Sequence, residues 1–385
     1  MTSLKTFPEL TLNIYSILNN ESEIYSVRNL LKEKQPENAV HRIDLPRIVL
    51  VGESILGKTC EVCHEVGAEK ALIVTGETTY KVAGKETAYN LEKTGVQTEC
   101  TFVKDATLFT VGQVIHKIQE YQADIVLGVG GGRNIDVAKA SSARTGKQFI
   151  SIPTVASHDG IASSLASIKG LGRPYTVKAA PPIAVIMDSK IIQNSPFRYT
   201  ASGCGDMICK ATEVQDWRLA HIENDEYYGA YAASLSLMSS EHVMKRASLI
   251  KQRTQEGIRT LLEALVSCGV AMSIAGSSRP TSGSAHLFSH ALDNINETPA
   301  LHGEQCGVGG IMMAKLHGLD WREMKEKLQI IGTPTTADEL GIDEEKIIKA
   351  LTIARSIRPE RYTILNKINM TRERAMELAK STDVI

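Results

Sequence analysis

The stretch Asp124-Ile-Val-Leu-Gly-Val-Gly-Gly-Gly132-Arg-Asn-Ile-Asp136-Val-Ala-Lys139 joins an apolar run, a glycine-rich turn and an amphipathic segment. This order predicts a buried β-strand that leads through the turn directly into a helix. Glycines let the backbone approach a ligand closely, and the free N–H groups of a helix start favour an anion such as a pyrophosphate. The turn departs from the GxGxxG fingerprint at Arg133, and by itself it is also compatible with a plain tight turn.

A second loop strengthens this interpretation. Residues 151–163, which follow the next apolar run, are small and polar and include Thr154, Ser157 and Ser163. The carboxyl ends of neighbouring parallel strands meet at one edge of a sheet, which is where such sheets bind nucleotides. The two loops together therefore predict a nucleotide site.

The residues around these loops alternate in the same way. Apolar runs of strand length are separated by amphipathic stretches of helix length, which predicts a parallel sheet covered on both faces, a Rossmann-like α/β domain. Strands are expected at residues 47–51, 71–75, 98–103, 124–128, 149–152 and 183–187, and helices at 56–66, 83–94 and 108–121.

The pattern changes near Pro196. Residues 227–246, 255–267 and 285–292 carry apolar side chains at helical spacing, which predicts an all-α second domain. We expect an N-terminal extension at 1–45 with one or two peripheral helices, a nucleotide-binding α/β domain at 46–195 and a helical domain at 196–385. The active site would lie in the cleft between the last two, with a hinge at 193–196.

Composition limits the classes of partner. The 385 residues amount to two ordinary domains, and the net charge of −1 excludes a global attraction to nucleic acid or anionic membranes. Seven cysteines, an odd number, indicate a reducing compartment. A secretory signal is not evident, and we expect no apolar run near the ~20 residues that span a bilayer. The sequence thus predicts a cytoplasmic protein that is not embedded in a membrane.

Two short motifs point to other functions. Gly52-Glu-Ser-Ile-Leu-Gly-Lys58-Thr59 matches the phosphate loop of nucleoside triphosphatases, with the strand ending at Asp188 as a possible magnesium holder. The bulky interior of this loop and the charge of Glu53 favour a simple turn from strand to helix. Cys60-Glu-Val-Cys-His64 matches redox and haem-attachment patterns, but both cysteines fall inside an expected helix, which favours structural cysteines.

Three histidines and an aspartate predict a metal centre. His286 and His290 lie four residues apart, so one helical face carries both imidazoles, and His302 stands between a turn and the next helix. Asp206, in Gly203-Cys-Gly-Asp206, is expected at a glycine-permitted helix start. Nitrogen and carboxylate donors without a thiolate suit zinc, iron or nickel with an open coordination position. Either of the paired histidines could instead be a hydrogen-bonded core residue.

With these motifs in place, the sequence resembles the metal-dependent polyol dehydrogenases, which include glycerol dehydrogenase, the iron alcohol dehydrogenases and, more distantly, dehydroquinate synthase. The resemblance runs from about Arg47 to Ile385 and includes the closing segments 332–341 and 357–365. It is greatest to the archaeal branch that sets the backbone stereochemistry of membrane lipids. It implies reversible, NAD(P)H-dependent reduction of dihydroxyacetone phosphate to sn-glycerol 1-phosphate by a cytoplasmic homo-oligomer, a dimer or larger.

The resemblance also implies roles for individual residues. The single divalent metal of each chain, zinc first and iron or nickel as alternatives, would be held by Asp206, His286 and His302. Asp206, His290 and Asp159 would contact the substrate, with His290 alternatively supporting a ligand. The implied NAD or NADP contacts are Gly132, Arg133, Asn134, Ile135, Asp136, Thr154, Val155, Ala156, Ser157 and Ser163.

Substrate and cofactor choice stay open at this point. Gly76, after the second strand, stands where relatives often carry an acidic residue that repels a 2′-phosphate, so both NAD and NADP are expected, although Glu77 is adjacent. No basic cluster identifies a site for the substrate's phosphate; the candidates are Arg355, Arg358, Arg361 and Lys178. The alternatives are therefore a glycerol dehydrogenase acting on glycerol and dihydroxyacetone with NAD, a nucleoside triphosphatase, or a silent metal-binding regulator.

Overall fold

A computed structural model describes residues 40–170, 173–298 and 300–385, with side chains omitted at 171–175. Residues 43–385 form one compact unit, and every element below belongs to it. The predicted extension at 1–45 lies almost entirely outside the described residues. The division of the remainder near residue 195 stays a prediction.

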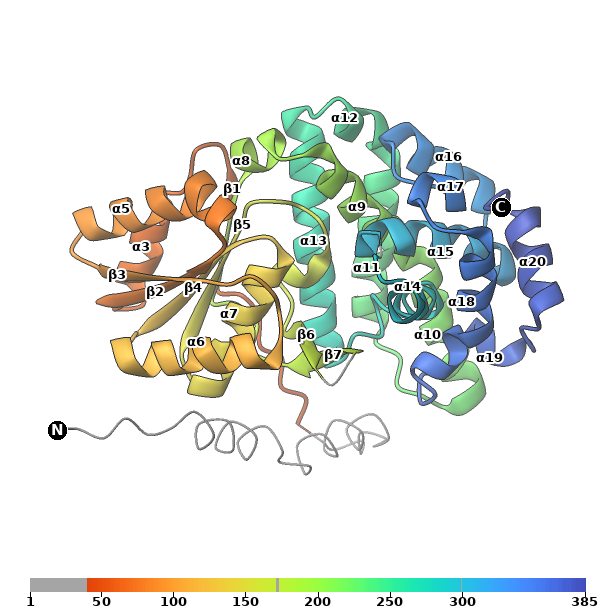
Figure 1. Cartoon of the computed structure of the whole chain (residues 1–385), viewed down its shortest axis with the longest axis horizontal. Coiled ribbons are helices and arrows are strands. Elements are labelled where there is room, and N and C mark those ends of the chain that lie inside the picture. Colours follow the sequence, from red (N-terminus) through yellow and green to blue (C-terminus); the bar gives the residue numbers. More distant parts are fainter. Residues whose placement is uncertain (1–39, 171–172, 299) are drawn as a thin grey trace. The chain divides into compact units, whose positions relative to one another are not determined.

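Six parallel strands form the central sheet, as predicted (Figure 1). Their spatial order is β1-β8-β5-β4-β2-β3. The register places Gly128 of β4 beside Ser151 of β5, so the glycine loop and the loop after β5 leave the sheet at the same edge. The strands are β1 Ile48–Gly52, β2 Lys70–Thr75, β3 Gln97–Phe102, β4 Ile125–Gly130, β5 Gln148–Pro153 and β8 Ala184–Asp188.

Helices cover both faces of this sheet, which confirms the predicted architecture. Successive residues of β2 face opposite sides: Ile73 packs in one apolar cluster, while Leu72 and Val74 pack in the other. The first cluster includes α3 and α5, and the second includes α6 and α7. These elements are α3 Lys58–Glu65, α4 Glu77–Thr79, the π-helix Tyr80–Gly84, α5 Lys85–Lys93, α6 Leu108–Tyr121, α7 Gly132–Thr145 and α8 Ser189–Asn194.

A two-stranded hairpin stands outside the predictions. Strands β6 (Leu165–Gly170) and β7 (Arg173–Lys178) pair antiparallel. Neither strand of the hairpin is a continuous apolar run of the kind that indicated the strands of the central sheet. It follows the 3-10 turn Asp159–Ile161, which belongs to the second predicted nucleotide loop.

From α9 onward the described chain is helical, as predicted. Helix α13 contacts β1 and the 159–161 turn as well as α9 and α11, and Figure 1 shows it standing between the sheet and the remaining helices. The helices are α9 Phe197–Ile208, α10 Lys210–Asn224, α11 Ala230–Lys245, α12 Ala247–Lys251, α13 Gln255–Ala275, α14 Ser284–Ile295, α15 His302–His317, α16 Trp321–Ile331, α17 Ala337–Leu340, α18 Glu344–Ile357, α19 Ile364–Lys367 and α20 Arg372–Ser381.

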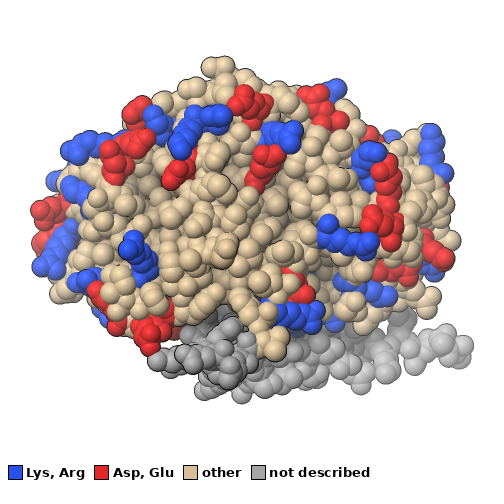
Figure 2. Space-filling view, turned by 180° about the vertical axis from the view of Figure 1, so that it is seen from behind, with Lys and Arg blue, Asp and Glu red and all other residues tan. Residues whose placement is uncertain are grey.

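Helix α13 also qualifies one expectation. Within the described residues it is long and apolar enough to cross a membrane, contrary to the expectation of no such run. Most of its residues are buried against neighbouring helices, as in the core helix of a folded domain. On the face seen in Figure 2, acidic and basic side chains are interspersed.

Candidate active site

The ends of three helices bring the predicted metal ligands together. Asp206 lies in the last turn of α9, His286 in the first turn of α14, and His302 opens α15. One ligand atom from each of these residues, and the sulfur of Cys306, lie within 4.8 Å of one another. Asp206 and His286 are buried, while His302 is partly exposed. The cluster can therefore hold a cation and still leave one side open.

The predicted position of Asp206 at a helix start is wrong. It lies near the C-terminal end of α9, and the flanking glycines have another purpose. A Cβ on Gly203 would stand 2.1 Å from the carbonyl oxygen of Ala156, and one on Gly205 would stand 2.1 Å from that of Gly303. These glycines allow α9 to touch both the loop after β5 and the start of α15.

Hydrogen bonds orient both ligand imidazoles. The Nδ1–H of His286 donates to Glu213 Oε1 at 2.6 Å, and its Nε2 faces Asp206 Oδ1 at 3.5 Å. Nδ1 of His302 hydrogen-bonds the Ser289 hydroxyl at 3.2 Å. A second partner on Nδ1 leaves Nε2 for the metal, which is the usual arrangement around ligating histidines. This donor set fits a divalent metal.

The pKa values of these groups are consistent with a cation site. Burial and the charge of Lys210 lower the pKa of His286, but its hydrogen bonds to Asp206, Cys209 and Glu213 outweigh them and raise it well above its usual range. The pKa of His302 falls well below its usual range because of burial and the neighbouring His286. One imidazole thus carries a proton among carboxylates, at a position that a metal ion would take over.

Lys210 and Glu213 are functional candidates that the sequence analysis missed. Lys210 Nζ is completely buried, 2.6 Å from Asp206 Oδ1 and 3.0 Å from Asp159 Oδ2. The backbone N–H of Asp159 also donates to Asp206 Oδ2 at 3.0 Å. Lys210 therefore ties the 159–161 turn to the metal cluster. The spacing of Lys210 and Glu213 could have indicated them, because they follow Asp206 by one and two helical turns.

A thiol lies among the candidate ligand atoms, which the sequence analysis did not anticipate. Cys306 Sγ is 3.5 Å from Nε2 of His302. Cys306 follows His302 by one helical turn on α15. Burial raises the pKa of the Cys306 thiol, so without a metal it is protonated and a weak ligand. The nitrogen and carboxylate ligand set stays a prediction.

His290 lies beside the cluster, as expected. Its ring stacks against that of His302, with centroids 5.8 Å apart and an interplanar angle of 27°. Nδ1 of His290 is 3.7 Å from Asp293 Oδ2, which leaves Nε2 as the atom able to reach a ligand. Burial lowers the pKa of His290, so the imidazole is neutral at pH 7 and can donate or accept one hydrogen bond.

The two predicted nucleotide loops meet at the edge of the sheet. The N–H of Thr154 donates to the carbonyl of Gly130 at 3.0 Å, and Gly130 has a φ of +147°, which favours glycine. A Cβ on Gly132 would stand 2.0 Å from His158 Nε2, so the imidazole of His158, a residue outside the predicted set, packs directly on the start of α7.

Side chains of the glycine-loop helix brace these loops. Asn134 Nδ2 donates to the carbonyl of Val129 at 3.1 Å, and Asp136 Oδ2 accepts from the N–H of Ser167 at 3.2 Å. Lys139 Nζ donates to the carbonyl of Leu165 at 2.7 Å. Asn134 and Asp136 thus hold the loops in place. The cofactor contacts of both residues stay predictions, as do the contacts expected for Arg133, Ile135, Val155, Ala156, Ser157 and Ser163.

The phosphate-loop alternative is contradicted by the geometry. The N–H groups of Ser54 and Ile55 donate to the carboxylate of Asp188 at 3.1 and 2.8 Å. A carboxylate of the chain thus takes the place that a nucleotide phosphate would need, and Asp188 also caps α8. Lys58 is paired with Glu61 at 2.6 Å on the surface. This segment is a strand-to-helix turn.

The two cysteines of the CxxCH segment are structural, as favoured from the sequence. Cys60 and Cys63 are buried and free. Burial raises the pKa of the Cys63 thiol to about 12, far from the range of a reactive thiolate.

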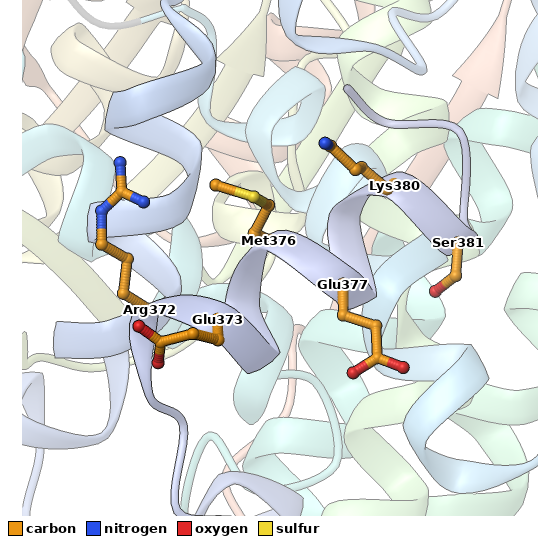
Figure 3. A pocket seen from close by; sticks show the side chains of 6 residues that line it. All are labelled: Arg372, Glu373, Met376, Glu377, Lys380 and Ser381. Atoms are coloured by element: carbon orange, nitrogen blue, oxygen red, sulfur yellow. The ribbon is translucent and has the colours of Figure 1, made fainter.

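A separate surface depression of about 540 Å³ lies along α20. Figure 3 shows the side chains of Arg372, Met376 and Lys380 on one side of the helix and those of Glu373 and Glu377 on the other. The depression is formed by one exposed helix and shares no residue with the metal cluster.

The Glu213–His286 pair leads to a first prediction. Glu213→Gln removes the charge that holds His286 Nδ1–H, and we expect metal affinity to fall by about 10 to 100-fold because such partners orient and polarise a ligand. Competition with a chromophoric chelator measures this directly. Glu241→Gln, on the exposed face of α11, removes the same charge as a control. Equal affinity of the two variants would contradict the assigned role.

Comparisons with known proteins identify relatives of this chain. Residues 50–196 match the family model described as iron-containing alcohol dehydrogenase. The glycerol dehydrogenase of Schizosaccharomyces pombe (TM-score 0.76, 18% identity, 91% of this chain and 92% of that one) shares the fold. So does a probable glycerol dehydrogenase of Sinorhizobium meliloti (TM-score 0.74, 19% identity, 90% and 98%).

Closer relatives carry one name, glycerol-1-phosphate dehydrogenase, with NAD(P)+ as its stated cofactor. The protein of Thermococcus kodakarensis is 52% identical over 91% of this chain and 100% of its own length. That of Pyrococcus furiosus is 51% identical over 90% and 100%, and that of Methanosarcina barkeri 51% over 91% and 98%. At this identity and coverage, the chain belongs to the family of NAD(P)-dependent glycerol-1-phosphate dehydrogenases.

Proposed function

We propose that this protein catalyses the reversible, NAD(P)H-dependent reduction of dihydroxyacetone phosphate to sn-glycerol 1-phosphate. The observation that carries the proposal is the meeting of Asp206, His286 and His302 within 4.8 Å, beside Asp159 and at the sheet edge where the nucleotide loops end. The names of relatives near 50% identity support the substrate.

The metal residues define one part of the mechanism. Asp206, His286 and His302 would hold one divalent ion, which when bound supplies Lewis acidity at the carbonyl oxygen of the substrate. Two imidazoles and a carboxylate favour zinc, with iron or nickel as alternatives. The fixed Nδ1 partners Glu213 and Ser289 keep the imidazoles in place, so little reorganisation is needed during reaction.

Other residues position the substrate and move its proton. His290, neutral at pH 7 and beside His302, can accept the hydroxyl proton at Nε2 during oxidation, and the imidazolium formed in this way returns the proton to the alkoxide oxygen during reduction. Asp159, held by Lys210, can accept a hydrogen bond from a substrate hydroxyl. The glycine loop and the start of α7 would bind the cofactor's pyrophosphate, so that hydride transfer occurs between the sheet edge and the metal residues.

The wider setting is also part of the proposal. The product would supply the glycerol backbone of archaeal membrane lipids. The enzyme would act as a homo-oligomer in the cytoplasm. The absence of thiol pairing among the seven cysteines, all free in the described structure, fits a reducing compartment.

A substrate and product assay tests the proposal. We expect NADH oxidation with dihydroxyacetone phosphate at a kcat/KM far above that with dihydroxyacetone, and a product that an sn-glycerol-3-phosphate dehydrogenase leaves unoxidised. Because Gly76 presents no side chain to a 2′-phosphate, the KM values for NADH and NADPH should differ by less than about a hundredfold. A clear preference for dihydroxyacetone would indicate a glycerol dehydrogenase instead.

A further inference from the structure

Arg358, directly after α18, carries a guanidinium that forms no ion pair with any carboxylate of the described residues. The residue is partly buried. Within the described part of the chain, its Nη2 donates a hydrogen bond to the Thr176 hydroxyl on β7 at 2.6 Å. Burial lowers the pKa of Arg358 and outweighs the opposing charge of the nearby Glu360. An unpaired, desolvated cation of this kind is stabilised when an anion binds.

The position of Arg358 relates it to the metal cluster. Helix α18 packs against α14, the helix that carries His286 and His290. His290 in turn stacks on His302. The hydrogen bond to Thr176 also connects Arg358 to the β6–β7 hairpin, which follows the 159–161 turn beside Asp206. Arg358 therefore joins two elements that adjoin the metal cluster, α18 through its packing on α14 and the β6–β7 hairpin through Thr176.

The other cations around the site already have partners. Lys210 contacts two carboxylates, and Arg361 is buried with its donors on the Ser278 hydroxyl and the Ser282 carbonyl. Arg198 pairs with Glu304 at 2.6 Å. Arg355 and Lys178, the remaining candidates from the sequence, are exposed. Arg358 differs from these cations because it is partly buried and has a single hydroxyl as its partner among the described residues.

We propose that Arg358 and the Thr176 hydroxyl form the subsite for the phosphate of the phosphorylated ketone substrate. The inference rests on the proposed function and deepens it. A guanidinium binds two phosphate oxygens with parallel N–H groups, and the Thr176 hydroxyl, which accepts from Arg358, can donate its own proton to a third oxygen. The β6–β7 hairpin and the end of α18 then bind the same anion, and this binding distinguishes dihydroxyacetone phosphate from dihydroxyacetone.

The test separates binding of phosphate from catalysis. For Arg358→Met, we expect KM for dihydroxyacetone phosphate to rise about a hundredfold with kcat changed by less than about threefold, because the contact is made equally in the ground and transition states. Arg358→Lys should recover part of the loss. Inorganic phosphate should compete with substrate in the wild-type enzyme, and at least tenfold more weakly in Arg358→Met. Lys349→Met, exposed on the same helix, removes an equal charge as a control.

Each outcome decides one point. An unchanged KM in Arg358→Met, or equal competition by inorganic phosphate in both enzymes, overturns the subsite. A fall in kcat with both ketones, or a loss of bound metal or of NADH affinity, shows that Arg358 supports the fold instead, and also overturns it. A wild-type enzyme that reduces dihydroxyacetone but not its phosphate overturns the proposed function itself, a result that the wild-type measurement alone reveals.

Discussion

Replacing His302 with alanine is expected to lower kcat for dihydroxyacetone phosphate reduction by roughly a thousandfold, because a Lewis-acid metal contributes several kcal/mol of charge stabilisation in the transition state. The variant should also be purified without stoichiometric metal. His302 is the first residue of α15. Truncating its side chain to alanine at this helix end leaves the backbone hydrogen bonds of the helix in place. The expected defect is therefore in the site and not in the fold.

Two measurements make this prediction decisive. Elemental analysis gives the metal content per chain, and thermal unfolding of the metal-free proteins shows whether the fold is retained. His242→Ala, at an exposed position on α11, removes an imidazole far from any candidate ligand in the sequence and should keep both metal and activity. Full activity of His302→Ala would overturn the metal assignment as a whole.

Most strands of the central sheet could be predicted because they are short apolar runs, whereas the edge strand β3 is largely polar. The expected strand at 71–75 is β2, Lys70–Thr75, and the helix expected at 108–121 is α6 at the same residues. Such elements are set by the local pattern of apolar side chains. The β6–β7 hairpin could not be predicted in this way, because neither of its six-residue strands is a continuous apolar run.

In the candidate site, too, the residues with a local sequence pattern could be predicted and those without one could not. His286 and His290 were found from their spacing on one helix, and the resemblance linked them to Asp206 and His302. The partners that hold these ligands were not found, since Glu213 reaches His286 across 73 residues of sequence and Ser289 reaches His302 only because α14 and α15 pack together. Tertiary contacts of this kind leave no local pattern.

The phosphate-loop motif is a local pattern that matches a site which the structure does not contain in the described residues. Gly52 to Thr59 satisfies the pattern, yet its amide groups bind Asp188, a residue 134 positions after Ser54. A short motif reports which backbone shape is allowed, and the partner of that backbone depends on what the rest of the chain places there. The same reasoning explains Gly203 and Gly205, which look like a flexible helix start but serve close packing.

The contact of α9 with α15 leads to the second large effect, in Gly303→Ala. A Cβ at Gly303 would stand 1.8 Å from the carbonyl oxygen of Ser202, a backbone atom that cannot rotate away. We expect a loss of about 3 kcal/mol or more in the free energy of unfolding, at the upper end of what overpacking costs. Urea or guanidinium unfolding of the metal-free protein measures this loss.

Gly307, one turn further along α15, provides the matched control. A Cβ there would have its nearest neighbours at 3.4 to 3.5 Å, which is ordinary van der Waals contact. Gly307→Ala should therefore be neutral or stabilising, because alanine is favoured over glycine inside a helix by up to about 1 kcal/mol. If both variants behave alike, the helices are not in close contact. If only Gly303→Ala is destabilised, relief of the clash must move α9 from α15, separating Asp206 from His302, so metal affinity should fall with stability.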